Sequence, residues 1–417
     1  MLRSTRKGFT GLNSLSTADK RNNARNESPG IAARYPRLKA IAEFLVVGIC
    51  TCMFALTTVG TLGSLLSNNA AGSRDFVEYW ASGKQLVDRA DPYDVNALTQ
   101  IERSAGFPKE IPALVMANPP SALLLVYPLG FLSATTAELL WLLLLLISLI
   151  ISVRIIWRLH GSPKSLVHLL AYSFAPALSC IFSGQVTLFM LLGLALFLRF
   201  HQSSPFLAGV SLWLCMLKPH LFVPFGVVLI LWAIRSRGYK VLAGASVSLI
   251  VSTLAVMAID PHVWGHYMEM MKTARVDRLA IPCVSVILRH WVTPHTVAIQ
   301  CLPVALGSGW AVSYFLKHRK NWNWVEHGSP LMLVSVLLAP YTWFMDQAVL
   351  IPAILHGAYV NRSRILFSFL ALASAIVEIG IFKDISLLHS PFYLWTTPCW
   401  LLWYLLATRN AEGNEAS

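Results

Sequence analysis

The acidic residues best placed to do chemistry lie in a polar segment, residues 68–112, which holds seven of the chain's 20 acidic residues. Asp75 and Glu78 stand three positions apart, a spacing that puts both side chains on one face of a helix. Two interpretations stay open: Asp75 caps the start of that helix, or it is a base that takes a proton from a substrate hydroxyl. On the second interpretation Glu78 is a candidate substrate-binding residue.

Lys218 and His220 flank Pro219 between two apolar segments. An ionisable side chain at such a position is costly and is often functional. One interpretation is that the lysine only reaches back to the lipid headgroups. The other is that Lys218 binds a phosphate as a point charge and that His220 is a second donor.

Two further polar residues interrupt apolar segments. Gln185 follows Ser183-Gly184, and its amide is suited to binding a sugar hydroxyl. Asp346 follows a Pro-Tyr-Thr-Trp motif and has no basic residue near it in sequence. It either pairs with a distant lysine or arginine or faces a polar cavity that binds substrate.

The segment 260–294 carries four basic residues: Lys272, Arg275, Arg278 and Arg289. An anionic substrate would explain them, and Arg275 and Arg278 are therefore candidate substrate-binding residues. Lipid headgroups would explain them as well.

The composition predicts the class of protein that must position these residues. Only 13% of the 417 residues are charged and 56% are hydrophobic, with a mean hydropathy of +0.59, whereas a soluble domain has about 25% charged residues. The apolar residues form repeated blocks long enough to cross a bilayer as helices, without the two-residue alternation of an outer-membrane barrel. The chain is predicted to be an all-α polytopic membrane protein.

The net charge of +13 is concentrated at the N-terminus. Residues 1–39 contain nine basic and two acidic residues, a net charge of +7. A basic flank before the first apolar segment indicates a cytoplasmic N-terminus and contact with anionic lipids rather than with nucleic acid. This tail is expected to be disordered.

Hydropathy and the positions of lysine and arginine together predict about 12 transmembrane helices. They are residues 40–66, 134–157, 165–182, 186–200, 206–217, 219–234, 241–259, 295–316, 329–342, 344–360, 364–382 and 392–408. Residues 113–132 are apolar but interrupted by prolines, so they either cross the membrane or form a short re-entrant or obliquely packed helix.

This topology sorts the polar segments between two faces. The basic turns and the tail 409–417 fall on the cytoplasmic side of a single membrane domain, residues 40–408. The outer loop 68–112, predicted to form two interfacial helices separated by the turn Asp91-Pro92-Tyr93-Asp94, falls on the opposite side with the outer loop 260–294. The candidate residues therefore converge on the outer face.

Several classes of function lack their sequence signatures. The chain has no glycine-rich phosphate loop, GxSxG or HExxH motif, and no internal repeat. Its seven cysteines are scattered, without metal-ligand spacing. No cofactor or metal site is expected, although the sequence leaves a divalent-metal requirement open.

Six motifs in order give the chain a family resemblance. They are Asp75-Phe-Val-Glu-Tyr-Trp-Ala-Ser-Gly83, Asp91-Pro-Tyr-Asp94, Asn118-Pro-Pro120 with Tyr127-Pro-Leu129, Ser183-Gly-Gln185, Lys218-Pro-His220, and Ala339-Pro-Tyr-Thr-Trp343 before Asp346. Together they resemble glycosyltransferase family 87. The resemblance implies a GT-C architecture and transfer of a sugar, typically mannose, from a polyprenyl-phosphate donor on the outer face. It also implies that Asp75 is the acidic residue required for transfer.

The sequence departs from the family in one motif, because Phe344-Met345-Asp346 stands where many members carry a histidine. The predicted function is an inverting membrane glycosyltransferase of the plasma (inner) membrane with Asp75 as general base. Its expected partners are a polyprenyl-phosphate sugar, a glycan or glycolipid acceptor, and membrane lipid. A secondary transporter or flippase for a lipid-linked or polar substrate is the alternative, and a non-catalytic scaffold would leave Asp75 and Lys218 unexplained.

Overall fold

A computed structural model describes residues 75–273, 283–293, 296–361, 363–383 and 390–415, together with residues 281 and 387 and the short stretches 45–46, 48–49, 52–57, 59–60 and 63. The chain divides into two compact units, Met1–Ile49 and Cys50–Ser417. The predicted disordered tail, residues 1–39, lies outside the described residues. Every regular element that is described is a helix, as predicted.

The predicted outer loop forms the two helices expected from its sequence, α4 (Phe76–Val87) and α5 (Val95–Ser104). The turn between them is stabilised by the Asp91 carboxylate, which accepts a hydrogen bond from the Tyr93 backbone N–H at 2.8 Å. This is the arrangement that an aspartate before a proline favours in a turn. The Tyr93 hydroxyl in turn donates to the Asn118 carbonyl, which attaches the loop to the next segment.

The proline-interrupted segment after the loop forms three short helical pieces: η2 (Pro120–Ala122), α6 (Leu123–Val126) and η3 (Tyr127–Phe131). Twelve helical residues span about 18 Å, too short to cross a hydrocarbon layer of about 30 Å. The segment instead packs against α4, where Gly83 and Gly130 allow the two backbones to touch. The short helical pieces favour a packed segment over a full crossing.

The remaining helices form a bundle around a buried apolar core. They are α7 (Ala134–Leu159), η4 (Leu166–Ala171), α8 (Ala175–Ser183), α9 (Thr187–Phe200), α10 (Pro205–Ser211), η5 (Leu214–Leu217), η6 (Pro219–Phe222), α11 (Val223–Ser236), α12 (Tyr239–Met257), α13 (Val263–Thr273), α14 (Val284–Val292), η8 (Val297–Cys301), α15 (Leu302–His318), α16 (Trp324–Leu337), η9 (Phe344–Leu350), α17 (Ile351–Val360), α18 (Arg364–Lys383), η11 (Pro391–Tyr393) and α19 (Thr396–Glu415).

The predicted count of 12 crossings is not confirmed. Four described helices are long and apolar enough to span a membrane: Ala134–Leu159, Pro219–Ser236, Tyr239–Met257 and Val297–His318. Other predicted spans are shorter, such as Thr187–Phe200, or begin with a 3-10 turn, as at Phe344 and at Pro391. The apolar helices nevertheless make this a membrane protein.

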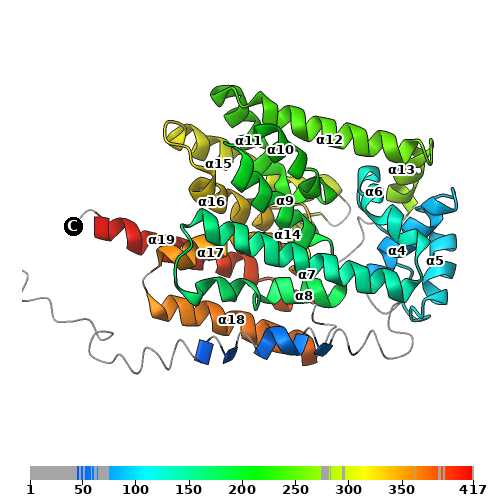
Figure 1. The fold of residues 1–417 in the computed structure, drawn as a ribbon, viewed down its shortest axis with the longest axis horizontal. Helices are drawn as coiled ribbons and strands as arrows, with labels where there is room; N and C mark the ends of the chain where they lie inside the picture. Colours follow the sequence, from blue (N-terminus) through cyan, green and yellow to red (C-terminus); the bar gives the residue numbers. More distant parts are fainter. Residues whose placement is uncertain are drawn as a thin grey trace, which may run out of the picture. The chain divides into compact units, whose positions relative to one another are not determined.

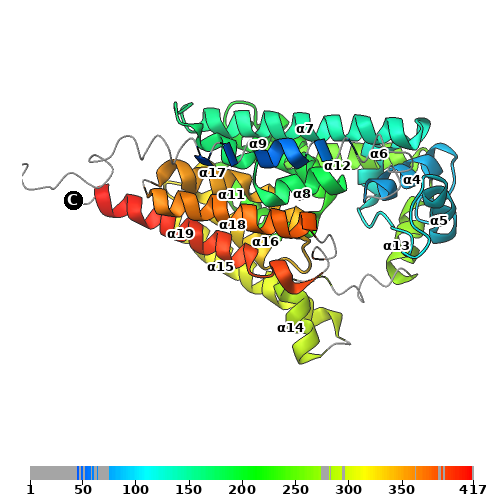
Figure 2. The ribbon, with the colours of Figure 1, turned by 90° about the horizontal axis from the view of Figure 1, so that it is seen from below.

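Within the second unit, α4, α5, α6 and α13 gather at one end, opposite the C-terminus (Figure 1). The turn between α4 and α5 contacts α13 directly, since the rings of Tyr93 and Tyr267 lie 5.5 Å apart. The same cluster is visible in the view turned by 90°, where α14 lies at the edge of the bundle opposite α7 (Figure 2). The two outer segments predicted from the sequence thus meet.

Candidate active site

The first candidate, Asp75, lies directly before α4 but makes no side-chain capping hydrogen bond to that helix. The capping interpretation is therefore wrong. Its Oδ2 atom instead accepts a hydrogen bond from Nε2 of Gln185, 110 positions away, at 2.8 Å. The side chain is only partly buried, so this carboxylate is held in place and still accessible.

Gln185 is positioned by the glycine before it. Gly184 ends α8 with a φ of +79°, a left-handed conformation that side chains with a Cβ rarely adopt. A Cβ atom here would also lie 2.8 Å from the Cβ of Phe76, and the Gly184 carbonyl accepts a hydrogen bond of 2.7 Å from Trp141 Nε1. The glycine therefore allows the turn to pack directly against the start of α4.

The amide of Gln185 makes hydrogen bonds with both Asp75 and Lys218. Its Oε1 atom accepts hydrogen bonds from the Tyr79 hydroxyl at 2.8 Å and from Lys218 Nζ at 3.2 Å. A lysine ammonium can only donate and a carboxylate accepts, so the oxygen faces Lys218 and the nitrogen faces Asp75. Because both ends of the amide are in use, Gln185 orients Asp75 relative to Lys218.

Lys218 forms a buried ion pair with Asp346, with Nζ 2.7 Å from Oδ1. The lysine side chain is 11% exposed and the aspartate side chain is fully buried, so Lys218 does not reach for the headgroups. Asp346 also accepts from the Thr187 hydroxyl at 3.1 Å and from the Trp343 backbone N–H at 2.9 Å. Of the two interpretations of Asp346, pairing with a distant lysine is confirmed.

His220 lies beside this ion pair. Its ring stacks on Tyr341 with 3.7 Å between the ring centroids, and among the described residues its buried Nε2 atom has no hydrogen-bond partner. Tyr341 belongs to the same segment as Trp343, which contacts Asp346. The motifs around Lys218 and Asp346 are therefore packed together.

Glu78 follows Asp75 on the adjacent turn of α4. Its side chain is partly accessible, yet burial among the surrounding side chains, followed by the nearby charge of Asp75, raises the pKa of Glu78 to about 8. At neutral pH this residue is mainly a neutral acid. It can then donate a hydrogen bond, which a carboxylate cannot.

Tyr79 and Thr187, which were not predicted from the sequence, complete the polar network. Both lie within two positions of a predicted residue, Tyr79 after Glu78 and Thr187 after Gln185. Arg275 and Arg278 lie outside the described residues. No group of three or more His, Cys, Asp or Glu side chains suited to a metal occurs in the part of the chain that the structure describes.

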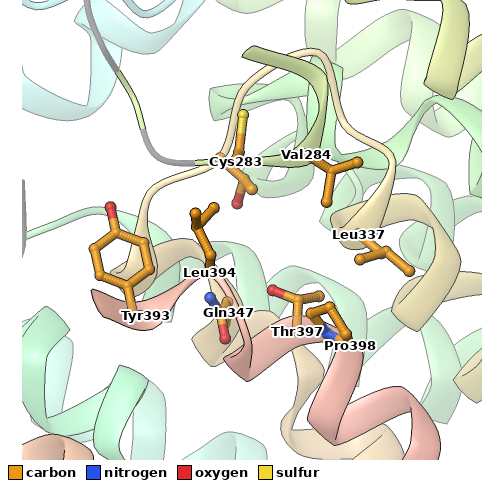
Figure 3. Close-up of a pocket in the computed structure, with 9 residues that line it drawn as sticks. Cys283, Val284, Leu337, Gln347, Tyr393, Leu394, Thr397 and Pro398 are labelled. Atoms are coloured by element: carbon orange, nitrogen blue, oxygen red, sulfur yellow. The ribbon is translucent and has the colours of Figure 1, made fainter. Parts of the chain in front are cut away.

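A small pocket lies next to this network. Figure 3 shows Cys283, Gln347 and Tyr393 around it, and its full lining is Cys283, Val284, Leu337, Thr342, Gln347, Tyr393, Leu394, Thr397 and Pro398. It has space for about one water molecule. It is too small for a hexose and holds none of the predicted site residues.

The sequence of much of this region matches a known family. The profile of glycosyltransferase family 87 matches residues 117–376, more than half of the chain. The chain belongs to glycosyltransferase family 87. It is accordingly a membrane glycosyltransferase. No curated protein and no solved structure matches the chain.

The family match covers part of the candidate site. Gln185, Lys218, His220 and Asp346 lie within the matched residues, whereas Asp75 and Glu78 precede them. The structure joins the two groups through the hydrogen bond between Gln185 and Asp75. The outer loop is thereby attached to the part of the chain that the family match covers.

Proposed function

We propose that this glycosyltransferase moves a mannosyl group from a polyprenyl-phosphate donor to a hydroxyl of a glycan or glycolipid. The reaction takes place on the outer face of the plasma membrane, in an all-helical fold of GT-C type. The N-terminus and the basic turns then lie in the cytoplasm.

The observation that carries the proposal is the state of Asp75. It is an accessible carboxylate that leaves its own helix uncapped and is oriented by a distant glutamine. A general base needs an available oxygen and a defined direction. Asp75 is partly exposed, and the hydrogen bond from Gln185 to its Oδ2 atom gives the carboxylate a defined direction.

The proposed reaction has one displacement. The acceptor oxygen attacks the anomeric carbon of the sugar, and Asp75 takes the proton from that hydroxyl. The bond between the anomeric carbon and the phosphate oxygen breaks, and polyprenyl phosphate leaves with the bonding electrons. Attack from the opposite side inverts the anomeric centre.

The remaining site residues support this step in different ways. Lys218 and His220 provide positive or hydrogen-bonding groups for the leaving phosphate, and Asp346 and Thr187 hold Lys218 in position. Neutral Glu78 donates to a hydroxyl of the sugar. Arg275 and Arg278 are further candidates for contact with the phosphate.

Purified protein in lipid nanodiscs tests the proposal directly. With polyprenyl-phosphate mannose and a lipid extract as acceptor, we expect release of polyprenyl phosphate and a product heavier by one hexose, measured by mass spectrometry. A matched D75N sample is the control. Equal hexose transfer by D75N would remove Asp75 from the mechanism, and no transfer from any polyprenyl-phosphate sugar would refute the donor class.

The orientation has a separate test. Single cysteines placed near residues 90 and 238 are labelled in intact cells with a membrane-impermeant reagent. Only the cysteine near residue 90 should react. Reaction of the cysteine near residue 238 alone would invert the topology.

A further inference from the structure

Arg289 is the most unusual charged residue outside the network around Lys218. It lies on α14 and is only 2% exposed. No described carboxylate pairs with it, its Nε atom makes no hydrogen bond, and its Nη2 atom only approaches His290 Nε2 at 3.5 Å. A guanidinium keeps its charge in a protein, and burying it without a counter-ion is strongly unfavourable. The missing partner is therefore expected to be an anionic ligand.

The position of Arg289 connects it with the candidate active site. Ser285, Val286 and Arg289 share one buried face of α14, at a spacing of three and four residues. Ser285 donates a hydrogen bond of 2.7 Å to the carbonyl of Ala339. Val286 belongs to a cluster that packs against Tyr341 and Trp343. This face of α14 thus lies against the segment 339–343, which contacts both His220 and Asp346.

Lys218 and Arg289 differ in whether a nearby carboxylate compensates their charge. The ammonium of Lys218 is already paired with Asp346 at 2.7 Å, so only part of its charge is left for a substrate. Arg289 has no such compensation among the described residues. Arginine also presents several donors in one plane, which suits the oxygens of a phosphate.

The surface next to Arg289 is suited to lipid. Trp291 and Val292, at the end of the same helix, are 85% and 57% exposed, and α14 lies at the edge of the bundle (Figure 2). Exposed tryptophan is typical of the boundary between headgroups and acyl chains. A phosphate attached to a long lipid would reach Arg289 at this depth.

We infer that Arg289 binds the phosphate of a lipid ligand, and, resting on the proposed function, that this lipid is the polyprenyl-phosphate donor. The same phosphate chemistry is available from an anionic phospholipid. The experiment therefore has to distinguish these two sources.

The decisive variant is R289M, made in the full-length protein in phosphatidylcholine nanodiscs. Methionine removes a buried charge that has no partner, so without ligand R289M should unfold at the same temperature as wild type or higher. Its affinity for polyprenyl phosphate, measured by the shift in unfolding temperature, should fall about 10- to 100-fold, as expected for loss of a charge-assisted hydrogen bond. R289K should recover part of this affinity.

Three results would overturn the inference. R289M that is less stable than wild type without ligand would mean that Arg289 has a protein partner. Unchanged affinity of R289M for polyprenyl phosphate, with no effect of anionic lipid, would exclude a phosphate role. Wild-type protein stabilised by neither lipid would exclude it as well.

Asp277, an acidic residue of the same outer segment, lies outside the described residues and supplies a control. D277N should change neither stability nor affinity. Equal destabilisation by D277N, R289M and the double variant would assign Arg289 to an ion pair with Asp277 and refute the inference.

Nanodiscs containing phosphatidylglycerol identify the source of the phosphate. One outcome is that phosphatidylglycerol stabilises wild type but not R289M while both bind polyprenyl phosphate equally. That result supports a phosphate site at Arg289 and assigns it to a phospholipid. Because the readout is binding, it is independent of sugar transfer. If Arg289 does not bind the phosphate, wild-type protein should still transfer sugar. If the protein does not transfer sugar, the affinities of wild type and R289M for polyprenyl phosphate can still be compared.

Discussion

Two aspartates of the predicted outer loop precede helices and have different surroundings. Asp94 caps α5, since its side chain accepts hydrogen bonds from the backbone N–H groups of Asn96 and Ala97 at 2.8 and 3.4 Å. Asp75 precedes α4 in the same way but caps nothing, and its carboxylate accepts from Gln185 of a distant turn. Asp94 is exposed, whereas Asp75 lies at the edge of a buried polar network.

The comparison shows why the type and place of a residue do not give its role. An aspartate before a helix is a good cap in general, and in sequence both residues fit that description. The deciding information is which donors surround the carboxylate in space. Asp94 stabilises its own helix, whereas Asp75 accepts a hydrogen bond from a distant glutamine.

The largest expected effect separates these two aspartates. D75N keeps the shape of the side chain but cannot accept a proton, so transfer should fall by about 10²- to 10⁴-fold with the fold intact. The matched control D94N should keep its rate and lose about 1 kcal/mol of stability or less. Transfer assays and thermal unfolding of both variants check this. Equal rates in D75N and wild type would make Asp75 another structural residue.

The next effect tests the buried pair. K218M leaves Asp346 buried without a counter-ion, which should cost about 3–5 kcal/mol of stability and reduce transfer about 10²-fold or more. K218R should recover part of both. The double variant K218M/D346N should regain stability but not transfer. Recovery of transfer in the double variant would show that Lys218 only balances the charge of Asp346.

Gln185 is expected to have an intermediate effect as a positioning residue. Q185L removes the hydrogen bond to Asp75, so transfer should fall about 10- to 100-fold, the range for hydrogen bonds to charged groups. Q185E adds a like charge next to Asp75 and should move the acidic limb of the pH–rate profile to higher pH. An unmoved profile in a folded Q185E would mean that Gln185 does not act through Asp75.

The smallest effect concerns Glu78 and depends on pH. The pKa of Glu78 is raised from 4.5 to about 8 in the folded protein, so its contribution to stability is complete below about pH 4.5 and is lost as the pH rises through about 8. Transfer should also fall about 5-fold above pH 8, when a second negative charge forms beside Asp75. E78Q should show neither decline. A wild-type profile that is flat from pH 7 to 9 would contradict this prediction.

Much of the fold could be predicted because membrane helices leave strong local signals. The all-helical class, the two helices of the outer loop and the short segment after it followed from apolar length, turn residues and prolines. The number of full crossings did not, because short helices such as Thr187–Phe200 and Pro205–Leu217 are apolar without being long enough to span a bilayer alone. Packing against neighbouring helices decides how such pieces sit, and hydropathy does not report it.

For the candidate site, the sequence alone determined which residues were chemically unusual. Asp75, Gln185, Lys218 and Asp346 each interrupt or flank an apolar segment, and a polar group in such a place is costly unless it has a partner. Only the tertiary structure decided who the partners are: Gln185 for Asp75 across 110 positions, and Asp346 for Lys218 across 128 positions. The reason is physical, since the cost of a buried polar residue depends on its own type and its local environment, whereas hydrogen bonds and ion pairs depend on distances of about 3 Å that arise only when separate helices pack together.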